Sequence, residues 1–78
     1  MQQIDNIVAL GKLIRAARRS QGLTQSQLAA AAGLGVRFIR ELEQGKETCH
    51  IGKSLLVIRL LGFNMLAVKR GVIIKEVK

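Results

Sequence analysis

Residues 23–46 read LTQSQLAAAAGLGVRFIRELEQGK, and this stretch decides the fold. Thr24, followed by Gln27 three residues later, has the form of a capping box that starts a helix. Four alanines then provide a small face that lets another helix approach closely, and a Gly-Leu-Gly turn at 33–35 interrupts the pattern. The stretch therefore predicts two short helices joined by a tight turn, over Thr24–Ala32 and Val36–Gln44.

Helical patterns continue on both sides of this stretch. From Asp5, a suitable N-cap, to Ser20, apolar residues recur at helical spacing on one side and basic residues on the other. From about His50 to Leu61 the apolar residues nearly encircle the helix, which predicts burial on more than one side. In so small a domain the second side needs a neighbouring chain, so Leu56 and Leu60 are predicted dimer contacts.

The pattern changes after Gly62. Met65–Val68 and Val72–Val77 are rich in β-forming residues, but a lone hairpin is hardly stable in water and its edge invites another strand. We therefore expect a mainly α fold with a short C-terminal β-element, a strand or hairpin, shared across a dimer. The expected division is 1–62 for the helices and 63–78 for the β-element. The interface residues expected in this element are Met65, Leu66 and Val68.

Length and cysteine content limit how the chain can be stabilised. A chain of 78 residues forms one domain, and domains of this size bury only roughly 60% of the surface that the unfolded chain exposes. A disulfide within the chain is excluded because Cys49 is the sole cysteine, and one Cys with one His cannot fill a zinc site. We expect oligomerisation, no metal and no cofactor, and the cysteine content fits a reducing, cytoplasmic location.

The charge indicates the kind of partner. Thirteen Lys and Arg against five Asp and Glu give a net charge of +8, which favours a polyanion bound through its phosphates. Only two residues are aromatic, Phe38 and Phe63, which argues against stacking of single-stranded bases. The chain contains no nucleophile–base set, so we do not expect an enzyme. Its longest apolar run, Leu55–Leu61, contains Arg59 and is far shorter than the roughly 20 residues of a membrane span.

Three quoted segments carry a family resemblance: LTQSQLA at 23–29, AGLG at 32–35 and IRELEQGK at 39–46. In this order they resemble the Xre/Cro, lambda-repressor-like helix-turn-helix family. The tail LLGF at 60–63, followed by β-type residues, resembles the HipB-like antitoxin branch of that family. The resemblance implies a four-helix domain that binds a palindromic operator in double-stranded DNA as a homodimer and represses transcription.

The resemblance also implies roles for single residues. The positions implied to meet base edges are Val36, Arg37, Arg40 and Glu41. The positions implied to contact the DNA backbone are Gln25, Gln44 and Lys46, and exposed cations of the first helix add Lys12 and Arg19. A structural ion pair is implied between Arg18 and Glu43.

Several alternatives stay open at the level of sequence. Arg40 reaches either a base or a phosphate, and Glu41 either accepts from cytosine or orients Arg37 as an i,i+4 partner. The HipB-like resemblance implies an antitoxin of a type II toxin–antitoxin pair with a HipA-like kinase toxin as partner. The alternative is a plain repressor without a toxin. A small basic RNA-binding or membrane-surface protein is a third possibility, and the basic amphipathic stretch Leu10–Arg19 resembles a targeting or membrane-surface helix.

Overall fold

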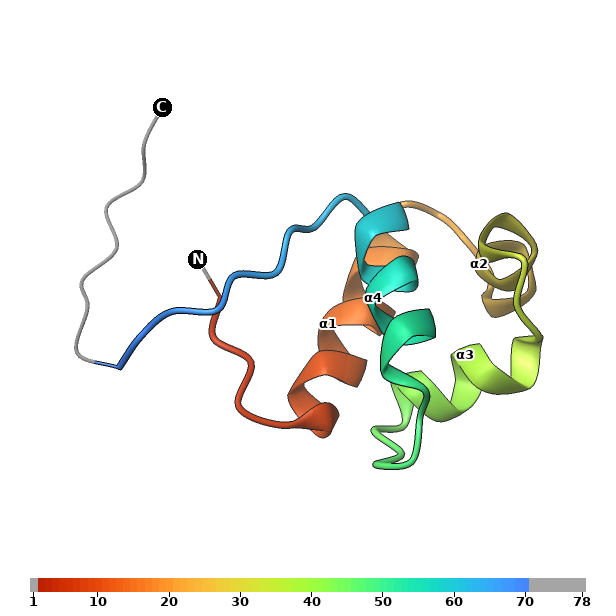
Figure 1. Cartoon of the computed structure of the whole chain (residues 1–78). Helices are drawn as coiled ribbons and strands as arrows, with labels where there is room; N and C mark the ends of the chain where they lie inside the picture. The colour runs from red at the N-terminus through yellow and green to blue at the C-terminus, as the bar shows by residue number, and fades with distance from the viewer. Residues whose placement is uncertain (1, 71–78) are drawn as a thin grey trace.

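The structure, a computed structural model, describes residues 2–70, which contain four helices joined by short loops. In chain order they are α1 (Ile7–Ser20), α2 (Gln25–Ala32), α3 (Val36–Glu43) and α4 (Ile51–Leu60). Figure 1 shows α2 and α3 together at one end of the molecule, with α1 and α4 beside them and the segments before α1 and after α4 on the opposite side. The four predicted helices are confirmed, with boundaries within about two residues.

Local side-chain hydrogen bonds set where the helices begin. The predicted capping box of α2 is present: Thr24 Oγ1 accepts from the N–H of Gln27 at 3.0 Å, and Gln27 Oε1 accepts from the N–H of Thr24 at 2.8 Å. For α1 the N-cap is Asn6 rather than Asp5, because Asn6 Oδ1 accepts from the N–H of Ala9 at 2.8 Å. Asp5 instead accepts from the amide of Gln3.

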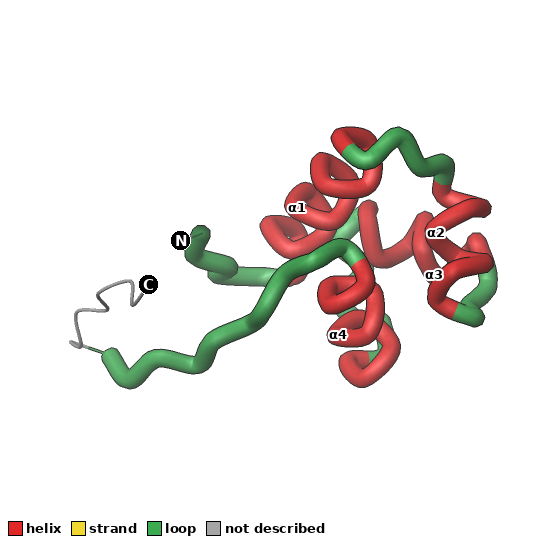
Figure 2. The backbone as a smooth tube through the Cα atoms, turned by 90° about the horizontal axis from the view of Figure 1, so that it is seen from above, coloured by secondary structure: helices red, strands yellow, loops and turns green. Residues whose placement is uncertain are grey.

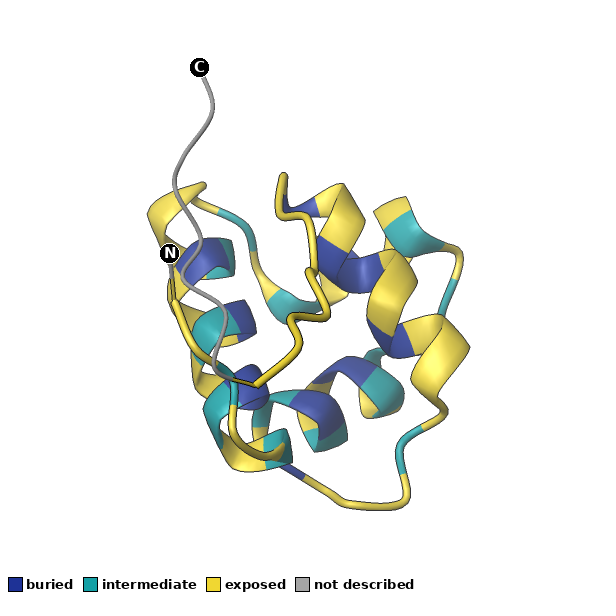
Figure 3. Cartoon of the chain, turned by 60° about the vertical axis from the view of Figure 1, so that its left-hand side comes forward, coloured by how far each residue is buried: buried dark blue, intermediate teal, exposed yellow. Residues whose placement is uncertain are grey.

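The core forms where the inner faces of all four helices meet (Figure 3). The apolar side of α1 that its helical spacing predicts faces this core, with Leu10, Ile14 and Ala17 buried. The buried apolar residues are Leu10, Ile14, Ala17, Leu28, Ala29, Ile39, Leu42, Val57, Ile58 and Leu61. The apolar surface of α4 is divided: Val57 and Ile58 are buried, whereas Leu56 and Leu60 are exposed to 40% and 46% in the single chain. One side of α4 therefore lies uncovered.

Helix α1 approaches α3 closely at Gly11, and this contact sets where Arg18 lies relative to the end of α3. A Cβ atom on Gly11 would lie 2.5 Å from the carbonyl oxygen of Leu42 and 2.7 Å from that of Glu43. Only glycine permits this spacing, since the atoms it faces are backbone. The contact brings the C-terminal end of α3 onto the middle of α1, within reach of the long side chain of Arg18.

The segment after α4 leaves the helices as an extended loop beside the N-terminal arm (Figure 2). No strand occurs within residues 2–70, so the predicted β-residues Met65–Val68 are a loop in the single chain. The physical reason is that a strand needs a hydrogen-bonding partner. The second predicted stretch, Val72–Val77, lies outside the described residues, and a β-element shared with another chain stays a prediction. None of the helices within residues 2–70 is long and apolar enough to cross a membrane.

Candidate functional site

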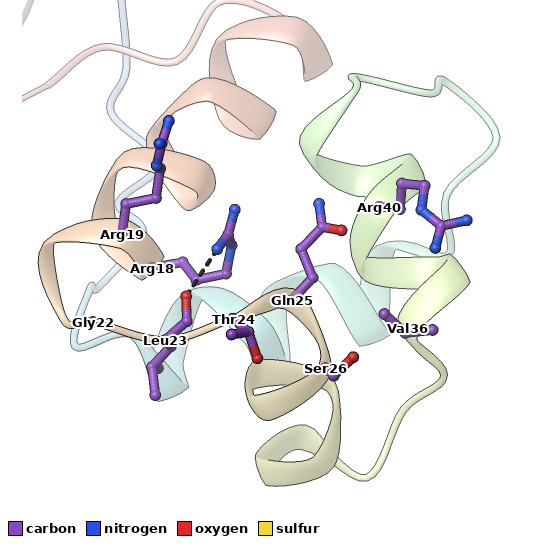
Figure 4. A pocket seen from close by; sticks show the side chains of 9 residues that line it. All are labelled: Arg18, Arg19, Gly22, Leu23, Thr24, Gln25, Ser26, Val36 and Arg40. Carbon is purple, nitrogen blue, oxygen red and sulfur yellow. Dashed lines mark hydrogen bonds between the residues drawn. The ribbon is translucent and has the colours of Figure 1, made fainter.

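An open depression of about 610 Å³ lies where α1 ends and where α2 and α3 begin (Figure 4). Its lining residues are Arg18, Arg19, Gly22, Leu23, Thr24, Gln25, Ser26, Val36 and Arg40. Three of these carry guanidinium groups and none carries a carboxylate. The first turn of α2 also opens on the depression, and a helix N-terminus adds unpaired N–H groups and positive partial charge. The depression therefore suits an anionic group.

A buried ion pair holds the wall of this depression. Arg18 Nε lies 2.6 Å from Glu43 Oε2, and Arg18 Nη2 donates to Glu43 Oε1 at 3.0 Å. The side chains are exposed to only 11% and 4%. Arg18 Nη1 also donates to the carbonyl oxygen of Leu23 at 2.8 Å, as Figure 4 shows. Hydrogen bonding to Glu43 raises the pKa of Arg18, so the guanidinium stays charged. These are the two residues predicted to pair, and they join α1, α3 and the turn before α2.

Gln25 connects this ion pair to the depression. Its Nε2 donates to Glu43 Oε1 at 3.2 Å, while the residue also lines the depression between Arg18 and Arg40 (Figure 4). An amide NH₂ group has two N–H donors. One is directed at Glu43, which leaves the second for a ligand. The buried carboxylate thereby sets the orientation of a side chain that the sequence assigns to a phosphate.

A second polar cluster lies on the outer face of α3. Arg37 Nε lies 2.8 Å from Glu41 Oε1, and Lys46 Nζ lies 2.9 Å from Glu41 Oε2. The side-chain exposures are 83% for Arg37, 48% for Lys46 and 24% for Glu41. Hydrogen bonds from Lys46 and then from Arg37 hold the pKa of Glu41 below its ordinary value. The carboxylate is therefore ionised at neutral pH and holds two cations.

The structure divides the predicted DNA-contacting residues into groups. Arg19, Gln25, Val36 and Arg40 share the depression. Arg37, Glu41 and Lys46 form the cluster just described. Two predicted contacts belong to neither group: Gln44, the exposed C-cap of α3, and Lys12, which lies on α1 two turns before Arg19.

Two features were missed by the sequence analysis. Thr24 and Ser26 line the depression beside Gln25, and Gln25 is tied to Glu43. The position of Thr24 and Ser26 could have been predicted from the sequence, because residues at and next to an N-cap lie around the first N–H groups of a helix. The second depends on how α2 packs against α3 and has no signal in the sequence.

A groove of about 670 Å³ lies on the opposite side of the molecule, between the N-terminal arm, α1, α4 and the loop after α4. Met65, Leu66 and Val68, which the sequence assigns to a dimer interface, line it and are exposed to 48%, 65% and 43%. Within residues 2–70 no group of three His, Cys, Asp or Glu residues is placed to hold a metal ion. Burial raises the pKa of the Cys49 thiol, which lowers its reactivity.

Comparison with known proteins finds a matching family, a curated relative and similar solved structures. A family described as helix-turn-helix (HTH_3) matches residues 14–63. An uncharacterized HTH-type transcriptional regulator, y4mF, from Sinorhizobium fredii is 51% identical over 53 residues, which are 68% of this chain and 70% of that protein. A solved structure described as the HipB-O4 20mer complex superposes with a TM-score of 0.80 at 21% identity, covering 90% of this chain and 99% of the other. The last match supports the fold.

Proposed function

Because the chain belongs to the helix-turn-helix family of DNA-binding transcriptional regulators, we propose that it is a sequence-specific repressor that binds a palindromic duplex operator as a homodimer. The observation that carries this proposal is the basic depression between α1, α2 and α3. It adjoins the outer face of α3, the helix that enters the major groove in this motif. A net charge of +8 favours the same ligand.

We assign two tasks to the residues of the site. Gln25, Arg19 and Lys46, with Gln44 and Lys12, contact phosphates and position the protein. Val36, Arg37 and Arg40 lie at the base edges, where side chains distinguish one sequence from another, and Glu41 lies beside Arg37. An arginine is able to donate two hydrogen bonds to guanine, and Val36 contacts the methyl group of thymine.

The uncovered apolar residues support a homodimer. Leu56 and Leu60 on α4, together with Met65, Leu66 and Val68, are all at least 40% exposed in the single chain. We propose that they are covered by a second copy, with 63–78 as the dimerisation element after the DNA-binding part, 1–62. Two recognition helices then enter successive major grooves, so that half-sites lie about one helical turn apart or a multiple of it.

Selection of bound sequences from random duplexes, with a mass measurement of the complex, tests this proposal. We expect a pseudo-palindromic site and a mass of two chains per duplex. Binding through about 6–10 phosphates should weaken roughly 10³- to 10⁵-fold between 50 and 200 mM salt. A single-chain complex, a flat salt response or preferential binding to RNA or anionic vesicles would contradict the proposal.

An antitoxin role is a second candidate. It is supported by the HipB-like resemblance of the sequence and by the fold shared with HipB. We propose that such a protein acts in the cytoplasm, represses transcription and also binds a HipA-like kinase toxin. Co-purification of the full chain with the product of the adjacent reading frame tests it. Recovery of a stable complex with a kinase-type protein supports the antitoxin role, whereas an adjacent frame that encodes no binding partner favours the plain repressor.

A further inference from the structure

We propose that Glu41 is a positioning residue that holds Arg37 for end-on recognition of guanine, and that it does not read a base itself. This inference rests on the proposed function, since it concerns how α3 would meet a base pair. It distinguishes between the two roles that the sequence leaves open for Glu41.

The first argument is which atoms of Glu41 are occupied. Each carboxylate oxygen already accepts a charged donor, Arg37 Nε at 2.8 Å and Lys46 Nζ at 2.9 Å. Such charge-assisted hydrogen bonds are stronger than a bond from a neutral amine. An amino group of cytosine would have to share or displace one of these cations. The carboxylate is therefore better matched to its two neighbours in the protein than to a base.

The second argument is depth on the helix surface. The side chain of Arg37 is 83% exposed, whereas that of Glu41 is 24% exposed. Arg37 therefore projects beyond Glu41, and an approaching base edge would meet the guanidinium first. Glu41 lies one helical turn after Arg37, where an i,i+4 partner supports the side chain.

The third argument is which donors of Arg37 remain available. Binding of Nε to Glu41 leaves the Nη1 and Nη2 groups at the outer end of the guanidinium. Two donors side by side match the O6 and N7 acceptors of guanine in the major groove. Because the hydrogen bond to Glu41 restrains the long side chain, less conformational freedom is lost when the base is bound.

Lys46 extends this arrangement beyond the helix. It lies in the turn after α3, and its ammonium group binds the same carboxylate that holds Arg37. Lys46 is assigned to the DNA backbone and Arg37 to a base, so Glu41 links a group that positions the protein to a group that reads sequence. Removal of Glu41 should therefore affect discrimination at the base pair read by Arg37.

The test uses the selected operator and duplexes in which each base pair is changed in turn. Dissociation constants are measured for the full-length wild type, Glu41→Ala, Arg37→Ala and the double variant. We expect Arg37→Ala to lose a preference for guanine of roughly 5- to 150-fold at one position per half-site. Glu41→Ala should lower the preference for guanine at the same position by at least about twofold. This factor corresponds to the smallest interaction free energy typical of two residues in contact. When Arg37 is already replaced by alanine, Glu41→Ala should not change the base preference further.

Glu47→Gln is the matched control, because it removes one exposed negative charge from the loop after α3 outside both polar clusters. It should raise affinity for all duplexes equally without changing base preference. Unchanged unfolding midpoints establish that the variants are folded. The inference would be overturned if Glu41→Ala lost a preference for cytosine at another position and did so also in the variant that lacks Arg37. An unchanged guanine preference would overturn it as well. Absence of any preferred duplex for the wild type would instead overturn the proposed function.

Discussion

Two carboxylates on α3, two residues apart, show how burial changes the consequence of the same chemistry. Glu43 on the inner face accepts from Arg18 and Gln25 and is 4% exposed. Glu41 on the outer face accepts from Arg37 and Lys46 and is 24% exposed. The distances from each carboxylate to its donors are similar in the two cases. The partners differ, because Arg18 is 11% exposed whereas Arg37 is 83% exposed.

This difference separates stability from recognition. A buried charge that loses its partner is costly, since neither water nor another group replaces that partner. An exposed pair is screened by solvent and contributes little to stability. Its members remain accessible to a ligand. The inner face of α3 is therefore suited to fixing the three helices around the depression, and the outer face to binding.

The strongest test of this contrast is Glu43→Gln, which leaves Arg18 charged and buried. We expect a loss of about 3–5 kcal/mol in the free energy of unfolding, measured by urea denaturation. The same change on the outer face, Glu41→Gln, should leave the midpoint nearly unchanged. Replacing both partners, as in Arg18→Met with Glu43→Leu, should cost much less than the sum of the single changes. Equal losses of unfolding free energy for Glu43→Gln and Glu41→Gln would contradict the proposed difference between the inner and outer faces of α3.

Gly11→Ala tests the packing that brings Arg18 to Glu43. The new Cβ would lie 2.5 Å from the carbonyl oxygen of Leu42, so α1 and α3 must separate. Overpacking of this kind costs about 1–3 kcal/mol, which outweighs the gain of up to roughly 1 kcal/mol in helix propensity. Thermal unfolding measures the net loss. Gly35→Ala, which adds a Cβ with no atom within 4 Å, is the steric control. A rise in stability for Gly11→Ala would show that the close approach is dispensable.

Gln25→Ala addresses the side chain that connects the buried ion pair to the depression. Loss of a hydrogen bond to a charged phosphate should weaken binding to every duplex sequence by about 1.5 kcal/mol, or roughly tenfold. Base preference should not change, in contrast to Arg37→Ala. Gln21→Ala removes a glutamine that donates to the carbonyl oxygen of Leu61, outside the depression, and should leave DNA affinity unaltered. A change of base preference on Gln25→Ala would contradict its assignment to a phosphate.

The smallest effect concerns the pH dependence of the outer cluster. Lys46 and Arg37 hold the pKa of Glu41 below its ordinary value. Because the pKa is lower in the folded than in the unfolded chain, the stabilisation is fully present above the ordinary carboxyl range. It is lost as pH falls through the folded pKa. The small difference in melting midpoint between wild type and Glu41→Gln should therefore shrink towards zero in acid. A difference that grows on acidification would contradict this sign.

The sequence by itself determined the four helices and the apolar side of α1, because apolar periodicity, N-caps and glycine turns are local signals. The capping box of Thr24 and Gln27 is an example. The pairing of Arg18 with Glu43 followed only from a family resemblance, since the residues are 25 positions apart. Only the tertiary structure decided that Gln25 binds Glu43, that Glu41 holds two cations, and that Met65–Val68 forms no strand in one chain. These outcomes depend on which elements meet in space, and sequence spacing does not specify that.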